Sequence, residues 1–469
     1  MSTATGALEA LAARLDGPVF LPGTPGYAAE VEGFDRSVRH HPAAVVCPTS
    51  PEDVVSAVRF ARANDLGVAV QNTGHGVSVA ADEALFISTK RMNQYDVDPH
   101  RRTARMEAGV LWEDVIAAAA THGLAPLSGS APFVGAVSYT LGGGIGVLSR
   151  RYGYAADHVH WIDVVTADGR LLRASETEHA DLFWALRGGK GNFGVVTAIE
   201  VDLFDVPRLY GGGLYFAADE TSEVLHTYRS WVADMPEELS SSFSMIPYPD
   251  LPFVPEPLRG RFATHIRLAY LGPADHGGQL IRPLRAVAPR LLDTVGELSY
   301  AQVGSIHGDL PIAGSYFING FQLTALDRGT IEALLALAGP DADGIIGVEV
   351  RHLAGALARP PRVPNAVAHR TAPFQLYSAS VLGNGRDDEV RAAHARLVEL
   401  LRPWNSGYRT LNFMAGVAYT DPSDVRVAFT DEAYLRLVAL KTRYDPANMF
   451  RFNHNIPPSL GARDTPRLP

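Results

Sequence analysis

The residues with the clearest chemical potential lie in one short stretch of the chain, Gln71-Asn72-Thr73-Gly74-His75-Gly76-Val77-Ser78. This stretch follows the apolar run 67–70, which predicts a short buried strand. Glycine tolerates positive φ and lets a backbone approach a ligand closely. Successive N–H groups in such a turn can form a concave site for an anion such as phosphate. The stretch fits either a plain polar loop or a phosphate-binding turn in which the His75 imidazole faces a cofactor.

Two further glycine-rich segments do not match the standard nucleotide motifs. Residues 141–146 would need glycine at position 147 to complete G-x-G-x-x-G, and Val147 stands there. Residues 187–194 lack the phosphate-loop spacing, and Lys190 is not followed by Ser or Thr. The first segment is a bend for close packing or a bare backbone on which a flat aromatic cofactor can lie. The second is a glycine loop that leads into a strand at Val195.

The remaining polar residues do not indicate a metal site or a serine hydrolase. His40 and His41 precede a proline, and His158 and His160 lie two apart without a third ligand nearby. The sequence has no G-x-S-x-G elbow. Cys47 is the only cysteine, which excludes a disulfide framework and a multi-cysteine metal site.

The bulk composition is that of an ordinary globular protein. The chain has 469 residues, of which 46% are apolar and 20% charged, so two or three domains are expected. The formal net charge of −10 argues against a general nucleic-acid binder, which needs a basic face. There is no apolar run long enough for a transmembrane span and no signal-peptide pattern at the N-terminus. We expect a cytoplasmic protein that binds neither nucleic acid nor a membrane.

The first part of the chain, residues 1–205, alternates helices with short strands. Ser50 and Pro51 suit the start of a helix, and Asp168-Gly169 suits the turn of a hairpin. The predicted helices are 50–63 and 112–122; the predicted strands are 67–70, 104–108, a hairpin over 161–173, and 194–203.

A change of composition at Asp205-Val206-Pro207 marks a second domain, predicted as an antiparallel sheet covered by helices. The whole chain is therefore expected to be α+β. The predicted strands lie near 209–216, 241–247, 262–271, 314–323, 344–350, 374–382 and 409–415. The predicted helices lie near 218–234, 274–288, 328–338 and 387–402, and another lies near 430–443.

The order and spacing of these segments resemble the FAD-linked oxidoreductases of the berberine-bridge-enzyme type, in the vanillyl-alcohol oxidase/p-cresol methylhydroxylase superfamily. The likeness runs from about Ala43 to Pro458. It rests on Pro48–Asp53, Thr73-Gly74-His75-Gly76, Ser128-Gly129…Gly135, Gly142-Gly143-Gly144-Ile145-Gly146, Tyr152-Gly153-Tyr154…Asp157-His158-Val159, Arg187-Gly188-Gly189…Asn192-Phe193-Gly194-Val195-Val196, and Tyr444-Asp445-Pro446-Ala447-Asn448-Met449-Phe450…Asn453-His454-Asn455-Ile456-Pro457-Pro458.

The resemblance implies a two-domain fold with a discontinuous flavin domain, residues 1–205 and 416–469. Residues 206–415 would cover the substrate face of the flavin. His75 would be joined to the flavin 8α-methyl, and its turn would bind the pyrophosphate. The implied FAD-binding residues are Gln71, Asn72, Thr73, Gly74, His75, Gly76, Val77, Ser78, Gly129, Val134, Gly135, Ser138, Gly142, Gly143, Gly146, Val159, Gly191, Gly194, Val195, Val196, Asn453 and Asn455.

Two positions bear on how the flavin would be attached and whether it would react with oxygen. Many relatives form a second flavin bond from a cysteine at the position of Ala131, and Cys47 is too distant in sequence to replace it. The resemblance therefore implies a single covalent bond, through His75, and a lower flavin reduction potential. Val134 aligns with a position beside flavin C4a that controls oxygen access, and a valine there is typical of an oxidase.

The catalytic base is a third departure from the family pattern. Relatives often carry a tyrosine at the position of Thr410, and Tyr408 would lie on the same face of the strand expected there. Arg409 would point to the opposite face. Tyr377 and Tyr316, on neighbouring expected strands, are the other candidates. A phenol must have its pKa lowered from about 10 to act as a base.

The resemblance implies an FAD-dependent oxidase that transfers a hydride from a small organic substrate, such as a secondary-metabolite intermediate, to flavin N5. O2 would reoxidise the flavin and give H2O2. The alternative is a protein of the same fold that keeps the flavin as a structural element and catalyses a non-redox cyclisation or only binds a ligand. A nicotinamide dehydrogenase is a more distant alternative. The sequence indicates no metal and leaves the oligomeric state open.

Overall fold

A small sheet near the N-terminus carries the histidine turn at the end of one strand. The computed structural model describes residues 2–343, 345–419 and 421–459. In this sheet β2 (Ala44–Val46) and β3 (Val68–Gln71) both run parallel to β4 (Leu85–Ser88), and β1 (Val19–Phe20) pairs antiparallel with β2. Helix α3 (Pro51–Ala63) packs on it. As predicted, this helix begins at Ser50, whose side chain accepts the Asp53 N–H at 3.2 Å.

A second sheet, antiparallel, forms the body of the same region. Its order is β5-β6-β10-β8-β9. The predicted hairpin is present as β8 (Val159–Val165) and β9 (Leu171–Ser175), and Gly169 in its turn has φ +75°. The other strands are β5 (Tyr95–Asp98), β6 (Thr103–Glu107) and β10 (Val195–Asp202). The apolar core around this sheet includes side chains of α4 (Trp112–Ala120), α5 (Ala136–Leu141), α7 (Ala180–Gly189) and α14 (Asp431–Tyr444).

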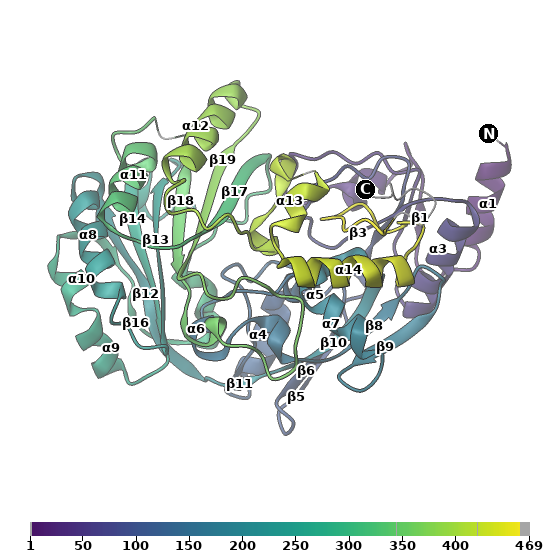
Figure 1. Ribbon diagram of the computed structural model, residues 1–469, viewed down its shortest axis with the longest axis horizontal. Helices are drawn as coiled ribbons and strands as arrows, with labels where there is room; N and C mark the ends of the chain where they lie inside the picture. Colours follow the sequence, from purple (N-terminus) through teal and green to yellow (C-terminus); the bar gives the residue numbers. More distant parts are fainter. Residues whose placement is uncertain (1, 344, 420, 460–469) are drawn as a thin grey trace, which may run out of the picture.

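The third sheet is the largest, with eight antiparallel strands. Its helices all lie on one face, on the left in Figure 1. The strands, in sheet order, are β15 (Arg290–Asp293), β12 (Arg208–Ala217), β14 (Phe262–Tyr270), β13 (Leu239–Pro247), β18 (Gly347–His352), β19 (Phe374–Val381) and β17 (Tyr316–Leu323), with β16 (Gly296–Ser299) also on β12. The covering helices are α8 (Thr221–Val232), α9 (Ala274–Leu280), α10 (Arg282–Ala286), α11 (Arg328–Ala338) and α12 (Asp387–Leu400). The predicted α+β class is confirmed.

The prediction of a strand over 409–415 is wrong. The segment contains a short 3-10 helix, Leu411–Phe413. Contact with the edge of β17 is made by the residues just before it, 404–408, and ends where the Tyr408 carbonyl accepts the Gln322 N–H at 3.1 Å. Asn412 then turns away and donates its side-chain N–H to the Tyr139 carbonyl at 2.8 Å. Because its hydrogen bonds go to two different parts of the molecule, the segment cannot extend a regular strand.

The helix predicted over 274–288 is interrupted. It forms α9 and α10 separately, because Pro283 near the start of α10 has no N–H with which to continue the first helix. Strands β15 and β16 follow and were not predicted, since each has only four residues.

The C-terminal segment returns to the first part of the chain, where α14 packs on α7 (Figure 1). The Lys441 ammonium, fully buried, bonds the Asp445 carboxylate at 2.7 Å and the Asn192 carbonyl at 2.8 Å. This contact fixes residues 450–456 beside the glycine loop that precedes β10. No helix in the described parts of the chain is both long and apolar enough to cross a membrane.

Candidate cofactor and substrate site

The turn that carries His75 is held by backbone contacts with an earlier segment. The Phe34 N–H donates to the Thr73 carbonyl at 2.8 Å, and the Asp35 N–H donates to the Gly74 carbonyl at 3.1 Å. Gly74 has φ +73°, and a Cβ there would lie 2.6 Å from the Gly33 Cα. Glycine is therefore required at position 74 by conformation and by space.

The His75 ring lies in a cluster with two phenylalanine rings, which also contact each other. It stacks on Phe34 with ring centroids 3.9 Å apart and an interplanar angle of 14°, and Phe133 lies 5.5 Å away. Nδ1 is 2.8 Å from the Thr73 hydroxyl oxygen, whereas Nε2 is buried and has no hydrogen-bond partner among the described residues. Burial lowers the pKa of His75 to about 4, so its imidazole is neutral at pH 7 with a lone pair available for bonding.

The segment with Val134 closes one side of the turn. A Cβ on Gly135 would lie 2.7 Å from the side-chain nitrogen of Asn72, so the two loops are in direct contact. Val134 is partly exposed, and the exposed Ser138 bonds back to the Gly135 carbonyl at 3.3 Å. Gly129 lies farther along the same wall, against the Tyr139 ring.

Residues 142–146 form the bend that the sequence suggested. Gly143 has φ +108°. A Cβ on Gly146 would lie 1.8 Å from the Ser128 carbonyl oxygen, and one on Gly142 would lie 2.0 Å from the Asn412 side-chain oxygen. These glycines therefore allow close backbone approach on both sides of the bend.

The C-terminal asparagines meet the glycine loop. The Asn453 side chain donates to the Gly191 carbonyl at 3.2 Å, and the Asn192 side chain donates to the His454 carbonyl at 2.9 Å. The side-chain oxygens of Asn453 and Asn455 are buried and find no partner within residues 2–343, 345–419 and 421–459. The loop, the C-terminus and the histidine turn thus line one cradle, which is closed where the Gly416 N–H donates to the Val77 carbonyl at 2.7 Å.

Four of the residues named from the sequence lie within the β8–β10 strand pair. The side chains of Val159, Val195 and Val196 are buried in the apolar core. A Cβ on Gly194 would lie 2.5 Å from the Val165 carbonyl oxygen. These four positions can therefore offer a cofactor only their backbone.

The cradle fits a polar, extended cofactor. Buried polar atoms are almost always hydrogen-bonded, so a group of partner-free ones fits a site where a polar ligand would supply their hydrogen bonds. Of the partner-free buried side-chain atoms in the described residues, those around the cradle belong to Gln71, His75, Ser78, Tyr139, Asn453, His454 and Asn455.

The large sheet presents its polar face away from its helices. Strand registers place one row of residues side by side across it: Tyr215, His265, Ser244, Glu349, Tyr377 and Gly320. The next row contains Gly213, Arg267, Ser242, Arg351, Gln375 and Gln322. Alternate residues such as Phe243, Val350 and Leu376 point into the core under the helices.

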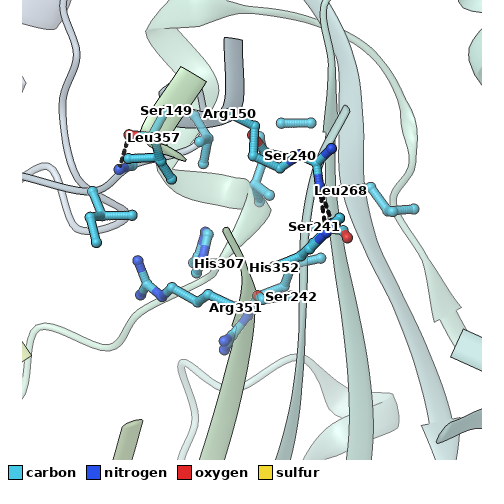
Figure 2. Close-up of a pocket in the computed structure, with 16 residues that line it drawn as sticks. Ser149, Arg150, Ser240, Ser241, Ser242, Leu268, His307, Arg351, His352 and Leu357 are labelled. Atoms are coloured by element: carbon cyan, nitrogen blue, oxygen red, sulfur yellow. Dashed lines mark hydrogen bonds between the residues drawn. The ribbon is translucent and has the colours of Figure 1, made fainter. Parts of the chain in front are cut away.

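Glu349 is the centre of a buried charge cluster on this face. Its carboxylate lies 2.9 Å from the guanidinium of Arg267 and 2.9 Å from that of Arg351, and it accepts the Ser242 hydroxyl at 2.8 Å. Burial opposes ionisation, but Arg351, Arg267 and His307 together hold the pKa of Glu349 well below its usual range. Figure 2 shows Arg351, His307 and Ser242 around one pocket between the sheet and residues 145–150.

Arg351 links this cluster to the cofactor wall. Its guanidinium donates to the Ser130 hydroxyl at 3.3 Å, one residue before Ala131, and lies 5.2 Å from the centre of the Phe413 ring. The polar face and the cradle are therefore two sides of one site, with Arg351 between them.

Comparison with known proteins agrees with this geometry. Residues 42–175 match the model of the FAD binding domain, and residues 424–457 match the family described as berberine and berberine like. The (R)-6-hydroxynicotine oxidase of Paenarthrobacter nicotinovorans is 30% identical over 462 residues, which cover 95% of this chain and 97% of the relative. This chain is a berberine-bridge-enzyme-like FAD-linked oxidoreductase.

Solved structures of this family share the fold. A crystal structure of 6-hydroxy-D-nicotine oxidase from Arthrobacter nicotinovorans superposes with a TM-score of 0.82 at 27% identity, covering 95% of this chain and 98% of that one. The BBE-like 1 protein of Physcomitrella patens has a TM-score of 0.82 at 19% identity, covering 97% of this chain and 99% of that one. The two-domain FAD-binding fold is thus confirmed.

The three tyrosines considered as the catalytic base differ in their exposure and contacts. Tyr408 is 45% exposed and stacks on His369 with ring centroids 3.6 Å apart; the strand that would have aimed it at the site does not exist. Tyr316 stacks near Phe34 and donates its hydroxyl to the Ile312 carbonyl at 2.6 Å. The sequence argument for Tyr408 therefore loses its structural basis.

Tyr377 lies on the polar face directly beside Glu349 and packs against Phe413 with ring centroids 5.9 Å apart. Burial, with the nearby charges of Asp309 and Glu349, raises the pKa of Tyr377 above its ordinary value. Burial and the Asp35 carboxylate likewise raise the pKa of Tyr316. Neither phenol has the lowered pKa that a tyrosinate base requires.

Arg267, Glu349, Arg351 and His307 were not predicted as site residues. Three of them lie in strands whose polar and apolar residues alternate, as in Val348-Glu349-Val350-Arg351. That alternation showed which residues share a face, but not which face the flavin domain covers.

Proposed function

We propose that this oxidoreductase is an FAD-dependent oxidase that takes a hydride from a small organic substrate, an intermediate of secondary metabolism. FAD would be held by one covalent bond, through His75. The flavin domain would comprise residues 1–205 and 416–469, and residues 206–415 would form the substrate domain. The observation that carries the proposal is the neutral, stacked His75 imidazole, with a partner-free Nε2, in a turn whose backbone is fixed.

The bound FAD would supply the redox chemistry, accepting the hydride at N5 and passing two electrons to O2 to give H2O2. The protein's own residues would bind the cofactor and orient it. The turn at residues 72–78 and the loop at 188–194 would offer backbone groups to the cofactor. Phe34, stacked on its face, and Phe133, tilted at its side, hold the His75 ring. The side-chain oxygens of Asn453 and Asn455 would accept hydrogen bonds from the cofactor.

The polar face of the large sheet would position the substrate. Tyr377 is a neutral phenol at pH 7, so it would donate or accept a hydrogen bond rather than act as a tyrosinate. Arg351 is fixed by Glu349 and would present its guanidinium at the boundary between substrate and cofactor. The family resemblance would put Val134 beside the flavin, where its small side chain would leave room for O2, and this supports the use of O2.

A second candidate function is a non-redox cyclase of the same fold. It is kept open because neither Tyr377 nor Tyr316 has the lowered pKa with which a tyrosinate base would take a proton from an oxidase substrate.

A test that needs no identified substrate separates the two functions. The purified protein is reduced anaerobically with light and EDTA and then mixed with O2. An oxidase reoxidises rapidly and forms one H2O2 per flavin, whereas slow reoxidation, at the rate of free reduced flavin or below, would contradict the oxidase proposal. A panel of cyclic amines and alcohols, including (R)-6-hydroxynicotine, is then tested for anaerobic bleaching of the flavin. A compound that is converted without bleaching would establish the non-redox alternative.

A further inference from the structure

Lys190 occupies a backbone position that suits glycine. It lies in the sequence Gly188-Gly189-Lys190-Gly191 with φ +53° and ψ −147°. This conformation is close to a region that is essentially restricted to glycine, because a Cβ there crowds the backbone. Strain of this kind persists where the side chain has a use.

The side chain reaches the centre of the cofactor cradle. Its ammonium donates to the Leu411 carbonyl at 3.3 Å and lies 3.8 Å from where a Cβ on Gly76 would be. Its Cε lies 2.6 Å from where a Cβ on Gly142 would be. The ammonium thus meets the residue after His75, the glycine bend and the 411–412 segment together.

The charge of Lys190 has no counter-charge in the described protein. It forms no ion pair with any Asp or Glu among residues 2–343, 345–419 and 421–459, and the one hydrogen bond found there is to a carbonyl. Lys441, the other deeply placed lysine, has the Asp445 carboxylate at 2.7 Å and two backbone carbonyls. Burial lowers the pKa of Lys190 to about 8, so the group is still mainly charged at pH 7.

The surrounding groups do not offset this charge. Burial, with the charge of Lys190, lowers the pKa of His454 to about 3, so the imidazole is neutral and its buried Nε2 has no partner. Strain and a positive charge without a partner are both unfavourable in the protein alone. An anionic ligand in the cradle would offset both.

We propose that Lys190 contacts an anionic group of the bound FAD and supplies the positive charge that stabilises it. This inference rests on the proposed function, because it takes FAD as the ligand. FAD offers two such groups. They are the pyrophosphate, which is charged in both redox states, and the N1–C2 carbonyl edge of the ring, which carries negative charge only when the flavin is reduced.

The test uses Lys190→Met, which removes the charge, Lys190→Gly, which also removes the strain, and Lys190→Arg, which keeps the charge. Lys90→Met is the matched control, since Lys90 donates to the carbonyls of Ala29 and Glu30, away from the cradle. The flavin midpoint potential is measured in each covalently loaded protein. The FAD dissociation constant is measured for the same substitutions in a His75→Ala background.

If the ammonium contacts the ring, Lys190→Met and Lys190→Gly should shift the reduction equilibrium at least tenfold toward oxidised flavin, about 30 mV for a two-electron couple. If it contacts the pyrophosphate, the potential stays constant and FAD affinity in the His75→Ala background falls at least tenfold. Lys190→Arg should retain most of either effect.

Unchanged potential and unchanged affinity in both charge-removing variants would overturn the inference, as would equal changes in Lys90→Met. A wild-type protein that contains no flavin would instead refute the proposed function. The two failures are therefore distinguishable.

Discussion

Replacing Lys441 with methionine is expected to destabilise the protein by about 3–5 kcal/mol, because it leaves a buried carboxylate without its counter-charge. Lys441 and Asp445 are both fully buried and lie one helical turn apart at the end of α14. The ammonium also bonds the carbonyls of Asn192 at 2.8 Å and Phe450 at 3.1 Å. The substitution therefore removes the ion pair and the two hydrogen bonds to backbone carbonyls.

In this variant the Asp445 carboxylate still has hydrogen bonds that stabilise its charge. Its carboxylate still accepts the backbone N–H groups of Met449 at 2.8 Å and Phe450 at 2.9 Å. These bonds keep the expected loss from rising further. They also imply that Lys441→Met/Asp445→Asn, which removes both charges, should be more stable than Lys441→Met alone.

Urea unfolding followed by tryptophan fluorescence measures the effect on wild type, both single variants and the double variant. Coupling of the two sites is then read from the double-mutant cycle. A loss below about 1 kcal/mol for Lys441→Met, the range of an exposed pair, would refute the reasoning. So would a double variant that is less stable than either single variant.

Three further predictions concern pH and oxygen. Burial is outweighed by the hydrogen bonds and charge of Asp202, which raise the pKa of His158 and of His160. The contribution of these ion pairs to folding stability is therefore complete below about pH 6.5 and is lost as pH rises through the raised pKa values of the folded protein. The stability advantage of wild type over Asp202→Asn, followed by thermal melting, should therefore shrink above about pH 6.5; a constant difference would contradict this. Because burial holds the pKa of His75 near 4, the rate of covalent FAD attachment to the cofactor-free protein should stay constant from about pH 8 to about pH 5 and fall near pH 4; a fall centred near pH 6.5 would show an ordinary histidine. Val134→Leu should slow reoxidation of the reduced flavin by O2 about tenfold in stopped-flow measurements, and an unchanged rate would show that Val134 does not control oxygen access.

Local patterns predicted most elements of this fold. The helix at Ser50–Pro51 and the Asp168-Gly169 hairpin depend on interactions within a few residues, and both appear where expected. The strand predicted at 409–415 is missing because the conformation of this segment depends on contacts that are distant in sequence. Its residues favour a strand, but its hydrogen bonds to Gln322 and to the Tyr139 carbonyl are long-range and leave no continuous partner strand.

The candidate site likewise contains residues that the sequence predicts and residues that only the structure brings together. The glycine segments and His75 could be named from the sequence because close backbone approach requires particular residue types. The charge cluster around Glu349 could not, because Arg267, Glu349 and Arg351 come together only through the register of three strands. Lys190 was visible in its glycine loop, but its position facing Gly76 and Gly142 depends on tertiary packing.

The most direct test of the account is whether flavin remains with acid-precipitated, denatured protein in wild type and in His75→Ala. The account predicts that the yellow colour stays with the wild-type precipitate and passes into the supernatant of the His75→Ala variant. Colour retained by both precipitates would mean that another residue carries a covalent bond to the flavin. A wild-type precipitate that loses its flavin would show that His75, despite its neutral and partner-free imidazole, does not bind FAD covalently.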